Sequence, residues 1–144
     1  MKIQTIFFLL ILSGFAHRIN SQNSPVITNK KYKIIFQLAS GDTTVHRSTI
    51  KQLFNVLAAS PKSTLEVVCH NAGISFLQIS KTTVGDKIQE LKNKGVVFAA
   101  CENTLRDRKI DKKDIVPQAI FVPSALIELA EKQNKGWAYI KAGN

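Results

Sequence analysis

A cysteine ends the apolar run in VVFAACENTL, residues 96–105, and polar residues follow it at once. If a helix begins at residue 102 or 103, its free amides and its dipole favour the thiolate of Cys101. Arg106 and Arg108 follow closely and add positive potential. A thiolate is a nucleophile that can accept sulfur, so Cys101 is the leading catalytic candidate. The alternative is a buried structural cysteine, since free cysteine packs like a small hydrophobic residue.

More polar side chains occur where neighbouring predicted strands end. In parallel α/β sheets, ligands bind outside the carboxyl ends of the strands. After the first three predicted strands, those ends carry Asp42, His46, His70, Asn71, Glu102 and Asn103. We predict that these residues line a ligand site. Surface or packing roles remain the alternative for the two histidines.

Cys69 follows two valines inside a predicted strand, so we interpret it as a core residue. The two cysteines belong to different elements, and their spacing leaves open whether they form a disulfide. No CxxC or HxH spacing indicates a metal site, and the usual nucleotide, phosphate and nucleophile-elbow motifs are missing from the sequence. We therefore expect no metal and no cofactor.

Short apolar runs alternate with amphipathic segments along residues 32–143, which indicates α/β architecture. We predict strands at 32–39, 65–70, 96–101, 118–122 and 137–142. Between them we predict helices at 44–59, from about 83 to 94, 102–108 and 123–135. Thr83 and Asp86 have capping-box spacing, and Gly95 and Gly136 are expected to end helices.

This alternation predicts a three-layer α/β/α sandwich with a mainly parallel five-stranded sheet and helices on both faces. The order of the strands is left open, although the alternating pattern of the last strand suits a sheet edge. The predicted core contains apolar residues from four of these elements: Ile50, Leu53, Val67, Val97, Phe98 and Ile120.

The first 21 residues differ from the rest of the chain. IFFLLILSGFA, residues 6–16, has the length of a signal-peptide core and is too short to span a bilayer. We interpret residues 1–21 as a signal peptide, with an uncleaved anchor as the alternative. The prediction is then a periplasmic or secreted protein with a polar linker at 22–31 and one domain at 32–143.

The chain has 20 basic and 10 acidic residues. Without Lys2 and Arg18, which lie in the predicted leader, the net charge of +10 falls to +8. The basic residues are scattered, which is typical of a solvated surface, and a small anionic ligand or protein partner is the alternative. We expect no nucleic-acid partner, because an exported protein seldom meets nucleic acid.

The segments KIIFQLASGDTTVHRSTIKQLFNVL, LEVVCHNAGISFL, KIQELKNKGVVFAACENTL and DIVPQAIFVPSALIELAEKQNKGWAYIKAG together resemble the DsrE/DsrF-like family. The resemblance covers about residues 32–143, and the chain would be an exported member. It implies a small three-layer α/β domain that tends to form homo-oligomers. Some members relay sulfur as a persulfide between donor and acceptor proteins, on a cysteine at the position that Cys101 occupies.

Two functional hypotheses follow. The first is a sulfur carrier, similar to a sulfurtransferase if it is an enzyme, that holds a persulfide on Cys101. The second is a non-enzymatic module that binds a small anionic ligand or a protein partner at the same end of the sheet, with inert cysteines.

Overall fold

The computed structural model describes residues 27–143, so the predicted leader and part of the linker lie outside the described residues. The strands are β1 Lys33–Leu38, β2 Thr64–Cys69, β3 Val97–Cys101, β4 Ile120–Val122 and β5 Ala138–Lys141. The helices are α1 Thr43–Ala59, α2 Gly85–Asn93, α3 Glu102–Asp107 and α4 Ala125–Asn134. Two short 3₁₀ helices, η1 Asn71–Phe76 and η2 Lys112–Asp114, complete the fold.

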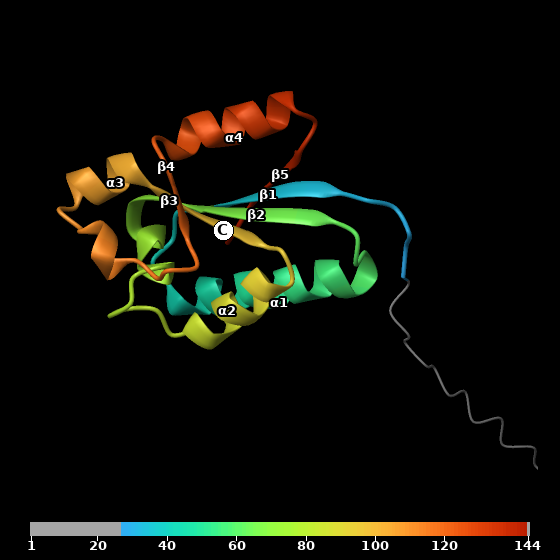
Figure 1. Ribbon diagram of the computed structural model, residues 1–144, viewed down its shortest axis with the longest axis horizontal. Helices are drawn as coiled ribbons and strands as arrows, with labels where there is room; N and C mark the ends of the chain where they lie inside the picture. Colours follow the sequence, from blue (N-terminus) through green and yellow to red (C-terminus); the bar gives the residue numbers. More distant parts are fainter. Residues whose placement is uncertain (1–26, 144) are drawn as a thin grey trace, which may run out of the picture.

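All five strands are parallel and lie in the order β4-β3-β2-β1-β5. The chain builds outward from β1 to β4 and then returns to place β5 on the other side of β1. Because crossovers between parallel strands are right-handed, the outward and return connections must lie on opposite faces. Figure 1 shows this arrangement, with α1 and α2 below the sheet and α4 above it. The predicted sandwich and the edge position of the last strand are confirmed.

The sheet is buried on both faces, as expected for parallel strands. On the α1 and α2 face, Phe36, Leu53, Val67 and Phe98 belong to the larger apolar cluster. On the α4 face, Ile35, Val68, Ala99, Cys101, Val122, Ala125 and Leu129 form a smaller one. The core predictions for Ile50, Leu53, Val67 and Phe98 are confirmed.

Two core predictions are wrong. Val97 is only partly buried at the start of β3. Ile120 is 42% exposed. It lies on the edge strand β4, opposite Ala99 of the α4 face, whereas α4 packs over β1, β2 and β5. No helix therefore covers Ile120 in the described part of the chain.

The helix ends follow from local chemistry. Gly95 and Gly136 have φ values of 88° and 79°, the left-handed conformation that glycine adopts readily and that stops a helix. The predicted capping box at Thr83 is wrong, because α2 begins at Gly85 and its N-cap, Val84, provides no side-chain hydrogen bond.

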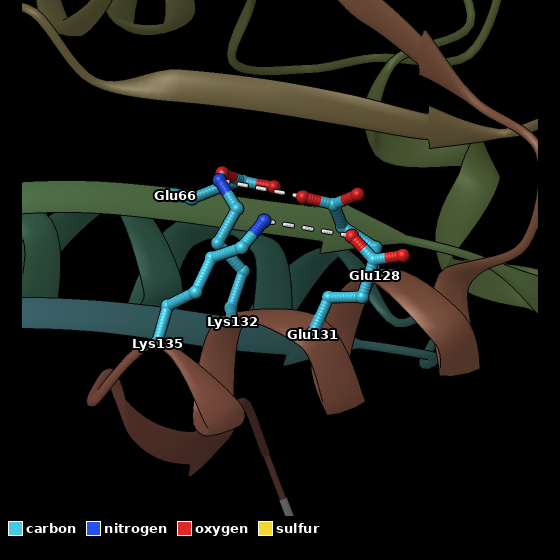
Figure 2. Close-up of polar contacts among 5 residues, drawn as sticks. All are labelled: Glu66, Glu128, Glu131, Lys132 and Lys135. Atoms are coloured by element: carbon cyan, nitrogen blue, oxygen red, sulfur yellow. Dashed lines mark hydrogen bonds and ion pairs between the residues drawn. The ribbon is translucent and has the colours of Figure 1, made fainter.

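An ion pair fastens α4 to the sheet. Glu66 on β2 is fully buried on the α4 side, and Lys132 extends from α4 toward the sheet to donate to it, as Figure 2 shows. Lys132 also lies 3.3 Å from Glu128 and 4.5 Å from the centre of the Trp137 ring. Lys132 thereby joins the helix, the central sheet and the start of β5.

Within residues 27–143, no helix combines the length and the apolar character that crossing a bilayer requires.

Candidate functional site

Cys101 lies where two helices begin. It is the last residue of β3 and the N-cap of α3. Its Sγ accepts a hydrogen bond of 3.3 Å from the backbone N–H of Ala125, the first residue of α4. The first amides of a helix have no partner within the helix, and a negative charge is favoured there. A hydrogen bond from such an amide is stronger to an ionised acceptor than to a neutral one.

The backbone fixes this position. Cys101 pairs with Val122 at the end of β4, and the N–H of Asn103 donates to the carbonyl oxygen of Pro123 at 3.3 Å. The turn from β3 into α3 is therefore tied to the turn from β4 into α4. The prediction that the thiol is followed directly by a helix is confirmed. Cys101 is only 4% exposed.

Cys69 has the opposite setting. It is fully buried in the larger cluster on the α1 and α2 face, whereas Cys101 belongs to the cluster on the α4 face. Both cysteines are free, so the disulfide that the sequence left open is not formed in this structure. Burial raises the pKa of the Cys69 thiol far above its usual range. Cys69 is a core residue, as predicted.

His70 lies on the same side of the sheet as Cys101. The β2–β3 register ends at Cys69 and Ala100, so the next residues on the two strands are His70 and Cys101. Two residues before them, Val68 and Ala99 both face α4. Side chains alternate between the faces, and His70 keeps an extended backbone with φ −146° and ψ 175°. The imidazole and the thiol are therefore neighbours on the α4 side of the sheet, at the carboxyl ends of β2 and β3.

Two polar residues position the His70 ring, one directly and one through the other. Gln37 of β1 contacts it, with 2.8 Å between Gln37 Nε2 and His70 Nε2. Tyr139 of β5 donates its hydroxyl hydrogen to Gln37 Oε1. A row of hydrogen-bonded side chains thus runs from the edge strand to β2. Partial burial lowers the pKa of His70, which favours the neutral ring.

A hollow of about 460 Å³ opens beside His70, with Asn71, Thr104, Asp107 and Arg108 on its walls. Asn71 has φ 49°, a left-handed conformation that asparagine tolerates. Its N–H donates to Thr104 Oγ1 at 3.0 Å, and its side-chain oxygen accepts from Arg108. These bonds connect the turn after β2 to α3.

A close approach of two backbones also shapes this edge. A Cβ added to Gly73 would lie 2.2 Å from the carbonyl oxygen of Leu38, so only glycine fits there. The Gly73 N–H donates to the Ala39 carbonyl oxygen at 2.9 Å. The turn that carries His70 and Asn71 is thereby pinned to the end of β1.

The other predicted ligand residues have partners of their own. Asp42 caps α1 and accepts from the Thr44 N–H at 2.7 Å. His46 is buried, donates from Nε2 to the Ser40 carbonyl oxygen at 2.8 Å, and meets Phe76 edge to face. These contacts give both residues structural roles, and their ligand-binding roles stay predictions.

Glu102 and Asn103 follow Cys101 at the start of α3. Glu102 pairs with Lys112, and the side-chain oxygen of Asn103 accepts from Arg106. Neither residue lines the hollow beside His70. Of the six predicted ligand residues, the structure brings only His70 and Asn71 together in one hollow. Among the described residues, no three histidine, cysteine or acidic side chains converge as a metal site.

Sequence patterns did not identify Gln37, Tyr139 and Thr104 as contributors, and they gave Arg108 no specific contact. One signal was present for Gln37, because it is the only polar residue in the strand segment IIFQL. A buried polar residue requires a partner. The identity of that partner depends on the pairing of β1 with β2 and β5, which local patterns do not specify.

Comparisons with known proteins agree with the fold. The sequence model of the DsrE/DsrF-like family matches residues 32–142. The solved structure of MTH1491 from Methanobacterium thermoautotrophicum, described as a protein of unknown function, is similar with a TM-score of 0.73 and 29% identity. That match covers 76% of this chain and 98% of MTH1491.

A second solved structure, BT1422 from Bacteroides thetaiotaomicron, is also described as a conserved protein of unknown function. Its TM-score is 0.55 at 14% identity, over 76% of this chain and 93% of BT1422, so it supports the fold alone. The comparison with curated proteins found no match.

Proposed function

The chain belongs to the DsrE/DsrF-like family, which suggests a sulfur-related function, and on this premise we propose that it carries sulfur as a persulfide on Cys101. One observation carries the proposal. Sγ of Cys101 accepts a hydrogen bond from the first free amide of α4, at the carboxyl ends of parallel strands. A helix amide at this position can donate to a thiolate, and ligands bind at this end of such sheets.

The transfer step is a displacement at sulfur. The Cys101 thiolate attacks the outer sulfur of a donor persulfide or polysulfide, a new S–S bond forms, and the donor S–S bond breaks. The donor leaves as a thiolate with the electron pair of the broken bond. An acceptor thiolate or another nucleophile then attacks the outer sulfur and releases the Cys101 thiolate. Both steps conserve the number of electrons, so no external oxidant or reductant is needed.

Access to the sulfur limits the donor. With 4% of Cys101 exposed, the attacked sulfur atom must approach a nearly buried Sγ. This limited access favours an unbranched donor end, such as a persulfide or a polysulfide. The amide of Ala125 can also donate to the loaded form, because a persulfide is itself an anionic acceptor.

Loading and discharge test the proposal. The protein is incubated with polysulfide, freed of excess reagent and treated with cyanide, which removes the outer sulfur as thiocyanate. We expect about one thiocyanate per chain from the native protein and from Cys69→Ser, and none from Cys101→Ser. Equal release from Cys101→Ser and the native protein would overturn the proposal.

We further propose that the protein acts after export, with donor and acceptor proteins of the periplasm or the exterior. The support is the signal-like leader, whose apolar run is followed by small residues. The N-terminal mass of the exported protein should correspond to cleavage near residue 17 or 22. An intact Met1 on the exported protein would contradict this.

A further inference from the structure

The hydrogen bonds around Gln37 specify where His70 carries its proton. Tyr139 donates to Gln37 Oε1, so the amide nitrogen of Gln37 faces His70 Nε2 at 2.8 Å. An amide nitrogen has two hydrogens and can only donate. His70 Nε2 must therefore accept, and in the neutral ring the proton lies on Nδ1.

His70 lines the hollow, and its Nδ1 has no protein hydrogen-bond partner within residues 27–143. Arg108 lines the same hollow and uses one guanidinium nitrogen on Asn71 Oδ1, which leaves further N–H donors. The side-chain NH₂ of Asn71 adds two more. Three neighbouring residues thus present donors and little acceptor capacity.

We propose that this hollow binds a small oxyanion, held by the Nδ1–H of a neutral His70, by Arg108 and by the side-chain amide of Asn71, with Gln37 and Tyr139 as positioning residues that fix the His70 tautomer. This site is separate from sulfur carriage on Cys101, since none of its donors involves the thiol. A tetrahedral oxyanion such as sulfate suits it better than chloride, because several oxygens can accept from donors in different directions.

Asp107 sets a limit on the affinity. Its carboxylate lies on the wall of the hollow and repels an anion, partly offsetting Arg108. Removing this charge should strengthen binding, whereas a site for a cation would respond in the opposite direction. Asp107→Asn therefore distinguishes an oxyanion site from a cation site.

The tautomer is measured by nitrogen NMR of the imidazole ring near neutral pH, with His70→Gln to assign the signals. We expect the His70 signal of the native protein to show a protonated Nδ1 and an unprotonated Nε2. Tyr139→Phe, on an exposed edge strand, should shift the signal toward a mixture of the two tautomers. A native ring protonated on Nε2 would mean that the Gln37 amide faces the other way, and would overturn the positioning role.

Binding is measured by titration with sodium sulfate against sodium chloride at constant ionic strength, following the amide signals of residues around the hollow. Arg108→Gln should weaken sulfate binding about tenfold, the loss of a charge-assisted hydrogen bond. Arg106→Gln is the matched control, because it removes the same charge from α3 at a residue outside this hollow. It should change the affinity less than about twofold, as expected for an exposed charge screened by salt.

Three results would overturn the oxyanion site. They are sulfate shifts no larger than those of chloride, equal losses in Arg106→Gln and Arg108→Gln, or weaker binding in Asp107→Asn. Cys101→Ser should bind sulfate like the native protein, so failure of the persulfide test leaves this inference unaffected.

Discussion

The two cysteines of this protein are both free and buried, but their surroundings differ. Cys69 is enclosed by the larger apolar cluster and has no polar neighbour that favours its thiolate. Cys101 accepts a hydrogen bond from a helix amide at the carboxyl ends of the strands, where polar side chains lie. Adjacent strands in register thus place one thiol in the larger apolar cluster and the other in the smaller cluster on the opposite face, on the side of His70.

We expect iodoacetamide to label Cys101 faster than Cys69 in the folded protein. Desolvation disfavours the Cys69 thiolate by raising its pKa, and burial also blocks the reagent. Peptide mapping of Cys69→Ser and Cys101→Ser, before and after unfolding, measures both sites. Faster labelling of Cys69 in the folded protein would contradict the difference in environment, and labelling of both only after unfolding would favour two structural cysteines.

Sequence patterns located Cys101, His70 and Asn71 because each lies at or just after the end of a strand, and strand ends can be predicted from apolar runs. The patterns could not assign the partner of Gln37 or the role of Tyr139. Those contacts depend on β5 lying beside β1, which places residues about a hundred positions apart in one row. His46 was predicted as a ligand residue because it follows the first predicted strand, and the structure shows that its ring meets Phe76 in the core.

The packing of helix α4 on the sheet includes a buried ion pair. Burial raises the pKa of the Glu66 carboxyl, and the Lys132 ammonium offsets part of this. One carboxylate oxygen of Glu66 is buried without a partner, so Lys132 provides the main compensation for the buried charge. Figure 2 shows that the neighbouring pair of Lys135 and Glu131 lies along the same helix, and it is solvent-exposed.

Lys132→Met should lower the free energy of unfolding by roughly 3 kcal/mol near pH 8, because it leaves a buried charge without its partner. The loss should shrink as pH falls. A carboxyl whose folded-state pKa is raised contributes stability that is present below its unfolded value, about 4.3, and is lost as pH rises through the folded value. The variant raises this pKa further, so its deficit relative to the native protein grows with pH.

Urea unfolding at several pH values measures this deficit. Lys135→Met is the matched control, since its partner Glu131 is exposed and 3.6 Å away, and it should cost less than about 0.5 kcal/mol. Adding Glu66→Gln to Lys132→Met should remove the extra pH dependence. Equal effects of the two lysine variants would show that Glu66 is solvated.

At the scale of elements, the strand and helix boundaries were predicted to within two residues. Alternation of apolar runs and terminating glycines are local signals, which explains this agreement. The start of α2 was wrong because capping-box spacing alone does not ensure that the threonine lies at the helix end. Glu66 in LEVVC went unnoticed, although a charge inside a buried strand indicates a partner from another element.

Across the whole molecule, one face of the chain is incompletely covered. On the α4 side, large apolar side chains lie exposed on β4 and the first turn of α4: Ile120 at 42%, Leu126 at 65% and Ile127 at 59%. A helix that carries apolar residues on its outer side as well as its inner side is typical of a buried environment. We propose that this surface joins copies of the chain in a homo-oligomer.

Leu126→Glu combined with Ile127→Glu should convert the oligomer to a monomer, because the charges would have to be buried in the contact. Size-exclusion chromatography with light scattering measures the mass. Ile79→Glu is the control, since Ile79 is 57% exposed elsewhere on the molecule. A native protein that is monomeric at all accessible concentrations would contradict the proposal.

The strand order could not be predicted from the sequence. The exposure of Ile120 could not be predicted either, because the strand order decides which strands α4 covers. The sequence shows that β4 is apolar. Its place at the edge of the sheet explains why no helix of the described chain covers Ile120. The whole-molecule arrangement therefore determines which apolar residues are core and which are available to a partner.

The central claim is that Cys101 carries sulfur, and intact-mass spectrometry after exposure to polysulfide tests it most directly. The native protein and Cys69→Ser should each gain the mass of one sulfur atom, and a thiol reductant should remove it. Cys101→Ser should gain none. Sulfur that appears on Cys101→Ser as readily as on Cys69→Ser, or on neither variant nor the native protein, would contradict the account.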